Sequence, residues 1–226
     1  MVDWFGSFPV APLLFAFLIP IVYSLVKRKE LKSILLMTAC SVGVVAFYPI
    51  TNFLSSSIPL FGYLIGKVIL FVLFPIGTIF FIERWSIKDI FTNLGVRKEN
   101  LKKSILYGLL AAVVTIAITT LIITSSQIDS VYSTVMFFES FTEEFFFRGF
   151  LLLYLMKKTS PKVAYATSIL GFILIHPQNF DNLFIISTMV QGVLMTVIAD
   201  KTKNIVGPWV GHGLNRVVPS LLRILF

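Results

Sequence analysis

SILYGLLAAVVTIAITTLIIT, residues 104–124, is a run without a single charged side chain. A helix of about 20 apolar residues is long enough to cross the hydrocarbon core of a bilayer, which is roughly 30 Å thick. The stretch therefore predicts a membrane-spanning α-helix.

Similar runs recur along the whole chain. Of the 226 residues, 57% are apolar and 13% are charged, and the mean hydropathy is +0.90, whereas about 25% of the residues in a soluble domain are charged. The apolar runs fall at about 8–26, 33–54, 58–82, 104–124, 131–156, 161–176, 182–199 and 206–226. We expect an all-α, polytopic membrane protein of about eight transmembrane helices. The longest polar connection, Glu83 to Lys103, is too short for a second domain, so residues 1–226 are expected to form one integral membrane domain.

The net charge of +8 is explained by topology. Fifteen of the nineteen basic residues lie in alternate connections between the apolar runs: Lys27, Arg28, Lys29, Lys32, Arg84, Lys88, Arg97, Lys98, Lys102, Lys103, Lys157, Lys158, Lys162, Lys201 and Lys203. The connections near Ser55, Gln127 and Asp181 hold none. Because basic residues collect in cytoplasmic loops, we expect a multi-pass protein of the cell membrane with both termini outside the cytoplasm. This distribution also argues against a nucleic-acid partner.

The remaining basic residues, Lys67, Arg148, Arg216 and Arg223, lie within apolar runs. A charge in hydrocarbon costs several kcal/mol, so such residues usually have partners or face a wet cavity. Arg223 is close enough to the end of its run to extend its charged group to the interface. For Lys67 the sequence leaves two interpretations, an acidic partner or a cavity wall. The single cysteine, Cys40, excludes an intrachain disulfide and a cysteine-based metal site.

The segment FTEEFFFRGF, residues 141–150, sets charges among phenylalanines. Glu144 and Arg148 stand four apart in the order that favours a helical ion pair, so we expect them to be partners. Glu143 is rotated by about 100° from Glu144 and shares a face with Glu139, away from Arg148. Burial and a like-charged neighbour both raise the pKa of a carboxyl group, which suits a group that takes and returns a proton near neutral pH. Glu143 is therefore the candidate general base. The alternative is that all three acids only hold helices together.

The chain has two histidines, His176 and His212, in or at the edge of apolar runs. At about 1.5 Å per residue, Glu143 lies roughly 20 Å, His176 roughly 22 Å, His212 roughly 12 Å and Asn215 roughly 16 Å from the cytoplasmic ends of their helices. These depths allow the four groups to meet in one intramembrane cavity if their helices are neighbours.

Taken in chain order, the glutamates with Arg148, the segment that ends at His176 and the segment that begins at His212 resemble the three motifs of the CPBP family. This family contains CAAX prenyl endopeptidases, bacteriocin-processing proteins and membrane proteins named Abi. The resemblance covers roughly residues 100–226, and that family has an eight-helix intramembrane fold. The matching residues are Glu143, Glu144 and Arg148, then Phe172 and His176, then His212 and Asn215.

The resemblance implies an intramembrane endopeptidase acting on a hydrophobic or lipidated peptide or protein. In it, Glu143 and His176 would hold and deprotonate the attacking water, while His212 and Asn215 would donate hydrogen bonds to the oxyanion. Glu144 and Arg148 would form the supporting pair. The third motif of the family usually reads His-x-x-x-Asn.

Here that fourth position is Arg216, and Asn215 stands one residue early. We expect Asn215 to reach the cavity and Arg216 to be displaced toward its edge.

The family has also been described as metalloproteases, and Glu143 with the two histidines could supply three ligands to zinc or another divalent metal. We favour a mechanism without a metal or other cofactor, because Glu143 cannot easily be both ligand and general base.

Two alternatives from other classes remain. One is an inert, immunity-type member that binds or regulates a membrane partner, for which the shifted Asn215 is the evidence. The other is a proton-coupled transporter, which the concentration of buried charges in the C-terminal half disfavours. Internal packing is the favoured interpretation of the Gly-x-x-x-Gly motifs at 62–66 and 207–211. The substrate and the oligomeric state are not indicated by the sequence.

Overall fold

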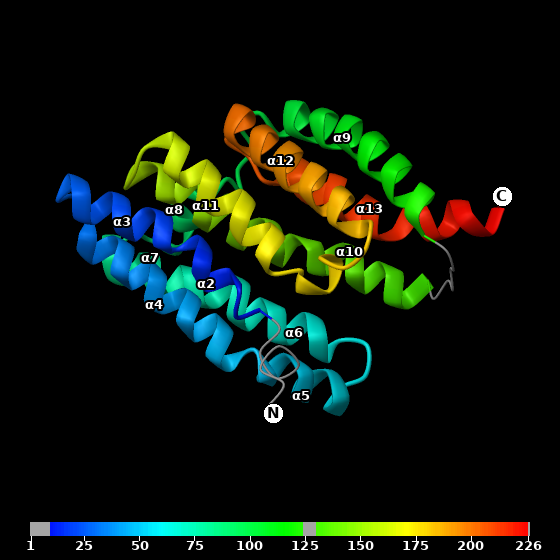
Figure 1. Cartoon of the computed structure of the whole chain (residues 1–226), viewed down its shortest axis with the longest axis horizontal. Helices are drawn as coiled ribbons and strands as arrows, with labels where there is room; N and C mark the ends of the chain where they lie inside the picture. The colour runs from blue at the N-terminus through cyan, green and yellow to red at the C-terminus, as the bar shows by residue number, and fades with distance from the viewer. Residues whose placement is uncertain (1–9, 124–129, 226) are drawn as a thin grey trace.

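The computed structural model describes residues 10–123 and 130–225, and this part contains helices and turns without a strand (Figure 1). The expectations for Gln127 and for the side chain of Arg223 fall outside the described part. In the first half, the helices are α2 (Leu13–Ala16), α3 (Leu18–Lys27), α4 (Leu31–Phe47), α5 (Pro49–Ser57), α6 (Gly62–Val68), the π-helix η1 (Ile69–Leu73), α7 (Phe74–Glu83), α8 (Ile87–Asn93) and α9 (Leu101–Ile122). In the second half, they are α10 (Ser130–Glu144), the π-helix η2 (Phe145–Tyr154), the short 3₁₀ helices η3 (Leu155–Lys157) and η4 (Pro177–Asn179), α11 (Pro161–Leu174), α12 (Phe184–Thr202) and α13 (Val206–Leu225).

Three helices of the described part are long and apolar enough to cross a membrane: the continuous helix Gly62–Glu83, α9 and α12. A fourth span results if α4 and α5, which meet at a bend of 42°, are counted as one. The expected all-helical fold is therefore confirmed for the described residues, with helices able to span a membrane, but the number of about eight spans is not confirmed. The number of spans differs partly because some expected runs are broken, as at the residue before Pro49, whose ring removes a helical N–H donor.

The phenylalanines of the 141–150 segment build the centre of the core. Four of them are fully buried on η2, namely Phe145, Phe146, Phe147 and Phe150. Phe146 meets Phe71 of η1 with ring centroids 5.1 Å apart, and Phe147 meets Phe172 of α11 at 5.5 Å. The aromatic run therefore packs η2 against two neighbouring helices, immediately after the glutamates in the sequence.

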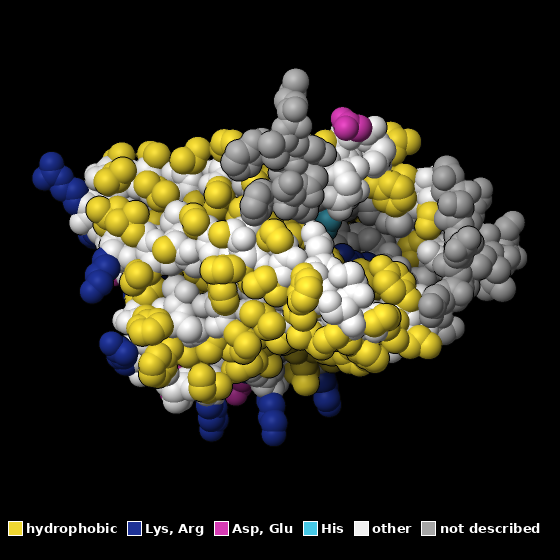
Figure 2. Space-filling view, turned by 90° about the horizontal axis from the view of Figure 1, so that it is seen from below, with side chains coloured by type: hydrophobic (Ala, Val, Ile, Leu, Met, Phe, Trp, Pro, Cys, Tyr) yellow, Lys and Arg dark blue, Asp and Glu magenta, His cyan; other side chains and the backbone are white. Residues whose placement is uncertain are grey.

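The outer surface of the bundle is also apolar. Phe15 and Val113 are each 68% exposed, and Leu121 is 88% exposed. Figure 2 shows hydrophobic side chains over most of one face of the molecule. Exposed apolar area of this extent is expected where the surrounding solvent is lipid.

Glycines bring two helix pairs into backbone contact. A Cβ atom added at Gly207 of α13 would lie 1.9 Å from the carbonyl oxygen of Ser104 on α9, and one added at Gly108 would lie 2.1 Å from the carbonyl oxygen of Gly207. At Gly62 of α6 the added atom would lie 1.8 Å from the carbonyl oxygen of Leu54 on α5. Both Gly-x-x-x-Gly motifs thus serve packing inside the chain, as predicted.

The four basic connections meet at one end of the bundle. Lys158 pairs with Glu30 at 3.3 Å and with Glu83 at 2.7 Å, and the amide of Asn204 donates to the carbonyl oxygen of Arg97 at 2.7 Å. Figure 2 shows Lys and Arg side chains projecting from the left end and the lower edge of the view, and a hollow toward its right side. The basic connections thus lie together at one end of the bundle.

Candidate active site

The charged and polar groups in the apolar segments converge from five parts of the chain. Glu139, Glu143 and Glu144 belong to α10, and Arg148 follows on η2. Lys67 comes from α6. On the other side, His176 lies between α11 and η4, while His212, Asn215 and Arg216 lie along α13. The helix that bears the glutamates changes from α to π geometry directly after Glu144, a feature frequently found at functional sites.

Glu144 is held by two partners. Its Oε2 lies 3.2 Å from Nε of Arg148, which confirms the predicted ion pair, and its Oε1 lies 2.8 Å from Nδ1 of His212. Arg148 is fully buried, donates to the carbonyl oxygen of Gly192 at 3.3 Å, and stacks 4.2 Å from the ring centre of Phe172. Glu144 therefore neutralises Arg148 and also orients His212, a second role that the sequence did not indicate.

The two oxygens of Glu143 have different surroundings. Oε1 accepts a hydrogen bond from Nζ of Lys67 at 2.7 Å and lies 3.5 Å from Nη2 of Arg216. Oε2 lies 3.8 Å from Nε2 of His176 and 3.8 Å from Nε2 of His212, and has no hydrogen-bond partner among the described residues. One oxygen is thus anchored by cations, and the other faces both histidines.

Lys67 and Arg216 correct two expectations. Glu143 was expected to be a carboxyl group with only a like-charged neighbour, but Lys67 and Arg216 both contact it. Both cations also pair with Glu139, and Nζ of Lys67 lies 3.0 Å from its Oε1. Arg216 was expected at the edge of the cavity, and it lies instead at the centre of the charge cluster. The open interpretation of Lys67 is resolved in favour of an acidic partner. The physical reason is the same in each case: the contacts join different helices, and helical spacing within one segment does not reveal them.

The hydrogen bonds fix the orientation of both histidine rings. Nδ1 of His176 lies 2.8 Å from the carbonyl oxygen of Phe172, and Nδ1 of His212 lies 2.8 Å from the carboxylate of Glu144. Since these oxygens only accept, each Nδ1 carries the proton. In the neutral rings, both Nε2 atoms therefore present lone pairs toward Glu143.

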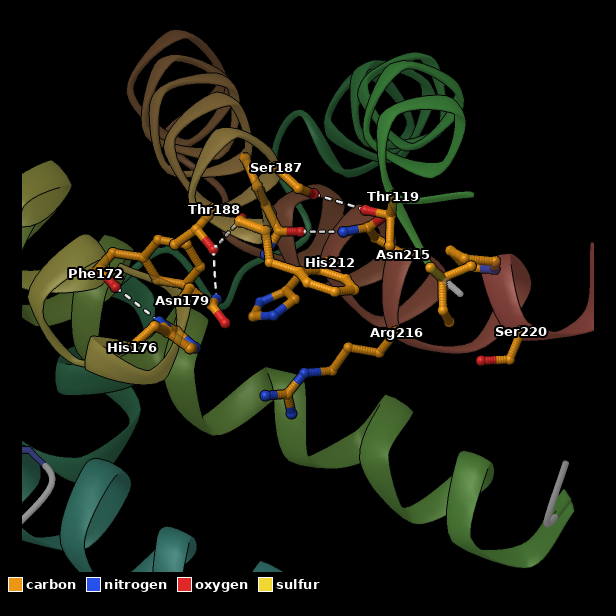
Figure 3. A pocket seen from close by; sticks show the side chains of 14 residues that line it. Thr119, Phe172, His176, Asn179, Ser187, Thr188, His212, Asn215, Arg216 and Ser220 are labelled. Carbon is orange, nitrogen blue, oxygen red and sulfur yellow. Dashed lines mark hydrogen bonds between the residues drawn. The ribbon is translucent and has the colours of Figure 1, made fainter. Parts of the chain in front are cut away.

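A cavity of about 270 Å³ opens beside the histidines (Figure 3). His176, His212, Asn215 and Arg216 line it, and Gln191 on α12, which the sequence reasoning missed, completes this wall. The amide nitrogen of Asn215 donates to Oε1 of Gln191 at 2.7 Å. Asn215 therefore reaches the cavity as predicted, but its donor group is engaged.

The residues do not fit a resident metal ion. Among residues 10–123 and 130–225, no group of three His, Cys, Asp or Glu side chains has the geometry of a metal site. Lys67 and Arg216 also hold two positive charges against Glu139 and Glu143, where they would oppose a divalent cation.

The comparison with protein families identifies the segment that carries this cluster. The family model described as Type II CAAX prenyl endopeptidase Rce1-like matches residues 126–218, which include every residue of the cluster except Lys67. No curated protein and no solved structure matches the chain. Residues 126–218, which are less than half of the chain, are therefore similar to the type II CAAX prenyl endopeptidases, a family of proteases.

Proposed function

We propose that this chain is an intramembrane endopeptidase in which Glu143 activates the water that hydrolyses the peptide bond. The observation that carries the proposal is the position of Glu143 Oε2, 3.8 Å from Nε2 of both His176 and His212 and free of a direct hydrogen bond among the described residues. The match of residues 126–218 to a protease family supports the same reaction class.

A separation of 3.8 Å is too long for a hydrogen bond and suits a bridging water. Such a water would donate one proton to Glu143 Oε2 and the other to Nε2 of His176. Glu143 would take its proton as the water oxygen attacks the peptide carbonyl carbon. The same proton would then pass to the leaving nitrogen as the C–N bond breaks, which restores the carboxylate. No metal takes part in this scheme.

The oxyanion needs hydrogen-bond donors, and three residues are close enough to supply them. His212 has its Nδ1 proton on Glu144, so it donates through Nε2 only when doubly protonated. The Asn215 amide must first leave Gln191. Arg216 is always charged, lines the cavity and is 21% exposed. We therefore assign the main stabilising charge to Arg216, with His212 and Asn215 as further donors.

The substrate is proposed to be a hydrophobic or lipidated peptide within the bilayer. A second cavity, of about 380 Å³, lies between α6 and α10, the helices that carry Lys67 and Glu143. Its lining includes Phe61, Leu64 and Phe138. An apolar cavity next to the charged cluster supports binding of an apolar substrate segment beside the scissile bond.

We further propose a multi-pass arrangement in the cell membrane, with the basic connections in the cytoplasm and both termini outside. The main cavity is lined by residues near the end of α9, such as Thr119, and near the start of α12, such as Ser187. Both are the helix ends remote from the basic connections. In this orientation, the cavity opens toward the non-cytoplasmic side.

One observation favours a second function. Arg216 replaces the usual asparagine and pairs with both Glu139 and Glu143, which would suit an inert member that binds a membrane partner. Purified wild-type protein and Glu143→Gln should be incubated with a panel of membrane peptides, lipidated and unlipidated, and the products identified by mass spectrometry. Cleavage by the wild type alone supports the peptidase. Intact peptides in both samples support the inert binder.

A further inference from the structure

A third cavity, of about 290 Å³, lies among the basic connections and shares no residue with the proposed active site. Arg97 from the connection before α9, Lys157 at the end of η3 and Lys203 after α12 bring three cations to it. Thr92 and Asn93 at the end of α8 add polar groups. Three separate parts of the chain thus direct basic side chains toward one open cavity.

The positive charge of this cavity is only partly compensated. Lys203 pairs with Asp200, and Lys157 donates to the side-chain oxygen of Asn93, which is neutral. The Nε of Arg97 is buried without a hydrogen-bond partner among the described residues. A buried guanidinium nitrogen without a partner is a donor that awaits an acceptor.

The electrostatics of Lys157 agree with this imbalance. Burial lowers the pKa of Lys157; the charge of Glu83 opposes that effect, whereas the positive charges of Arg97 and Lys158 reinforce it. The repulsion from Arg97 and Lys158 thus acts in the same direction as burial and disfavours the charged form of Lys157. An anion in the cavity would relieve both effects.

The cavity also has the features of a membrane boundary. Its remaining lining residues, Leu153 and Met156, are apolar. Nζ of Lys157 lies 5.0 Å from the ring centre of Trp85, and that ring meets Tyr154 at 6.1 Å. Trp and Tyr are enriched where headgroups meet acyl chains, and basic pockets between helices at that level bind anionic headgroups.

We propose that this cavity binds a phosphate-bearing anion, with Arg97, Lys157 and Lys203 as its cationic ligands and the headgroup of an anionic phospholipid as its natural occupant. The guanidinium of Arg97 suits two phosphate oxygens at once, and the two ammonium groups suit a single oxygen each. The bound phosphate would join the α8–α9 connection to the ends of η3 and α12. This proposal is independent of the peptidase assignment.

The test compares wild type with the double variant Arg97→Gln/Lys157→Gln and with the control Lys88→Gln/Lys102→Gln, which removes the same charge from exposed positions outside the cavity. Each protein in neutral detergent receives dioleoyl-phosphatidylglycerol, dioleoyl-phosphatidylcholine or inorganic phosphate. Melting temperature and native mass spectrometry report binding. Melting of each unliganded protein, with gel filtration, verifies that it is folded.

Phosphatidylglycerol should raise the melting temperature of wild type and control and remain bound to each as a single adduct. The double variant should bind phosphatidylglycerol at least about 10-fold more weakly, which is a loss of about 1.4 kcal/mol of binding free energy. An equal saturable response to inorganic phosphate alone would support the site with free phosphate as its occupant. If the double variant does not fold, competition between phosphate and phosphatidylglycerol on wild type decides in its place. Two results would overturn the proposal. One is equal binding of phosphatidylglycerol by wild type and a folded double variant. The other is an equal effect of phosphatidylglycerol and phosphatidylcholine on wild type without any response to phosphate.

Discussion

Nε2 of His176 and Nε2 of His212 lie at the same distance, 3.8 Å, from one oxygen of Glu143. The two histidines come from different segments of the chain and approach the carboxylate with their lone-pair nitrogens, because their Nδ1 protons are donated to Phe172 and Glu144. The other oxygen of Glu143 is held by Lys67. This arrangement fixes the carboxylate while leaving one oxygen available to a water.

The adjacent glutamates are expected to respond differently to the same substitution. Glu143→Gln should abolish peptide cleavage and cost little stability, since Glu139 still pairs with Lys67. Glu144→Gln should lower the stability by about 3–5 kcal/mol, because it leaves the fully buried Arg148 without its anionic partner. Melting in detergent and peptide cleavage, measured on both variants, check this. Identical melting curves together with identical activities would show that the roles are not divided in this way.

Lys67 is expected to position Glu143. Lys67→Met should lower both stability and turnover, because Glu139 and Glu143 then share Arg216 as their cation. Adding Glu139→Gln to Lys67→Met should restore part of the stability by removing one unpaired charge. A double-mutant cycle on the melting temperature measures this coupling. Strictly additive effects would mean that Lys67 does not act through its acidic partners.

The donors to the oxyanion can be separated at two neighbouring positions. Arg216→Ala should lower kcat by about 100- to 1,000-fold, which is typical for the loss of one oxyanion donor. Arg216→Asn, which restores the usual spacing of the family motif, should recover part of that loss. Asn215→Ala should have a smaller effect, since its amide is engaged by Gln191. A larger kcat loss in Asn215→Ala than in Arg216→Ala would reverse this assignment.

Glycine packing between α9 and α13 gives a prediction that does not depend on catalysis. Gly207→Ala should destabilise the fold strongly, because its new Cβ would lie 1.9 Å from the Ser104 carbonyl oxygen. Gly77→Ala is the matched control: its added Cβ meets nothing within 4 Å, and alanine favours a helix by about 1 kcal/mol over glycine. Equal melting temperatures of these two variants would contradict the close contact.

The parts of the site that the sequence predicted depend on local spacing. The pair Glu144–Arg148 follows from a separation of one helical turn, and the similar depths of Glu143, His176 and His212 in the membrane allowed these groups to meet. All of these groups are brought together in the structure. Helix geometry alone was sufficient for the Glu144–Arg148 pair, whereas the meeting of the other three groups also required that their helices be neighbours, which depth along a helix does not show.

The contacts that the sequence did not predict join distant segments. Lys67 and Glu143 are 76 positions apart, and nothing in the periodicity of α6 or α10 specifies that these helices are neighbours. The cost of a buried charge indicated that Lys67 needs a partner, without identifying it. The span number was uncertain for a related reason, since bends such as the one between α4 and α5 depend on tertiary packing.

The most direct test of the central claim is hydrolysis in oxygen-18 water, with metal chelator present throughout. Purified wild type should cleave a membrane peptide and place one oxygen-18 atom in the new carboxyl group, whereas Glu143→Gln should leave the peptide intact. Both the chelator resistance and the loss with Glu143→Gln follow from a carboxylate that accepts the proton of water unaided. Cleavage by Glu143→Gln at the wild-type rate, or wild-type activity that chelation stops and zinc restores, would contradict the account.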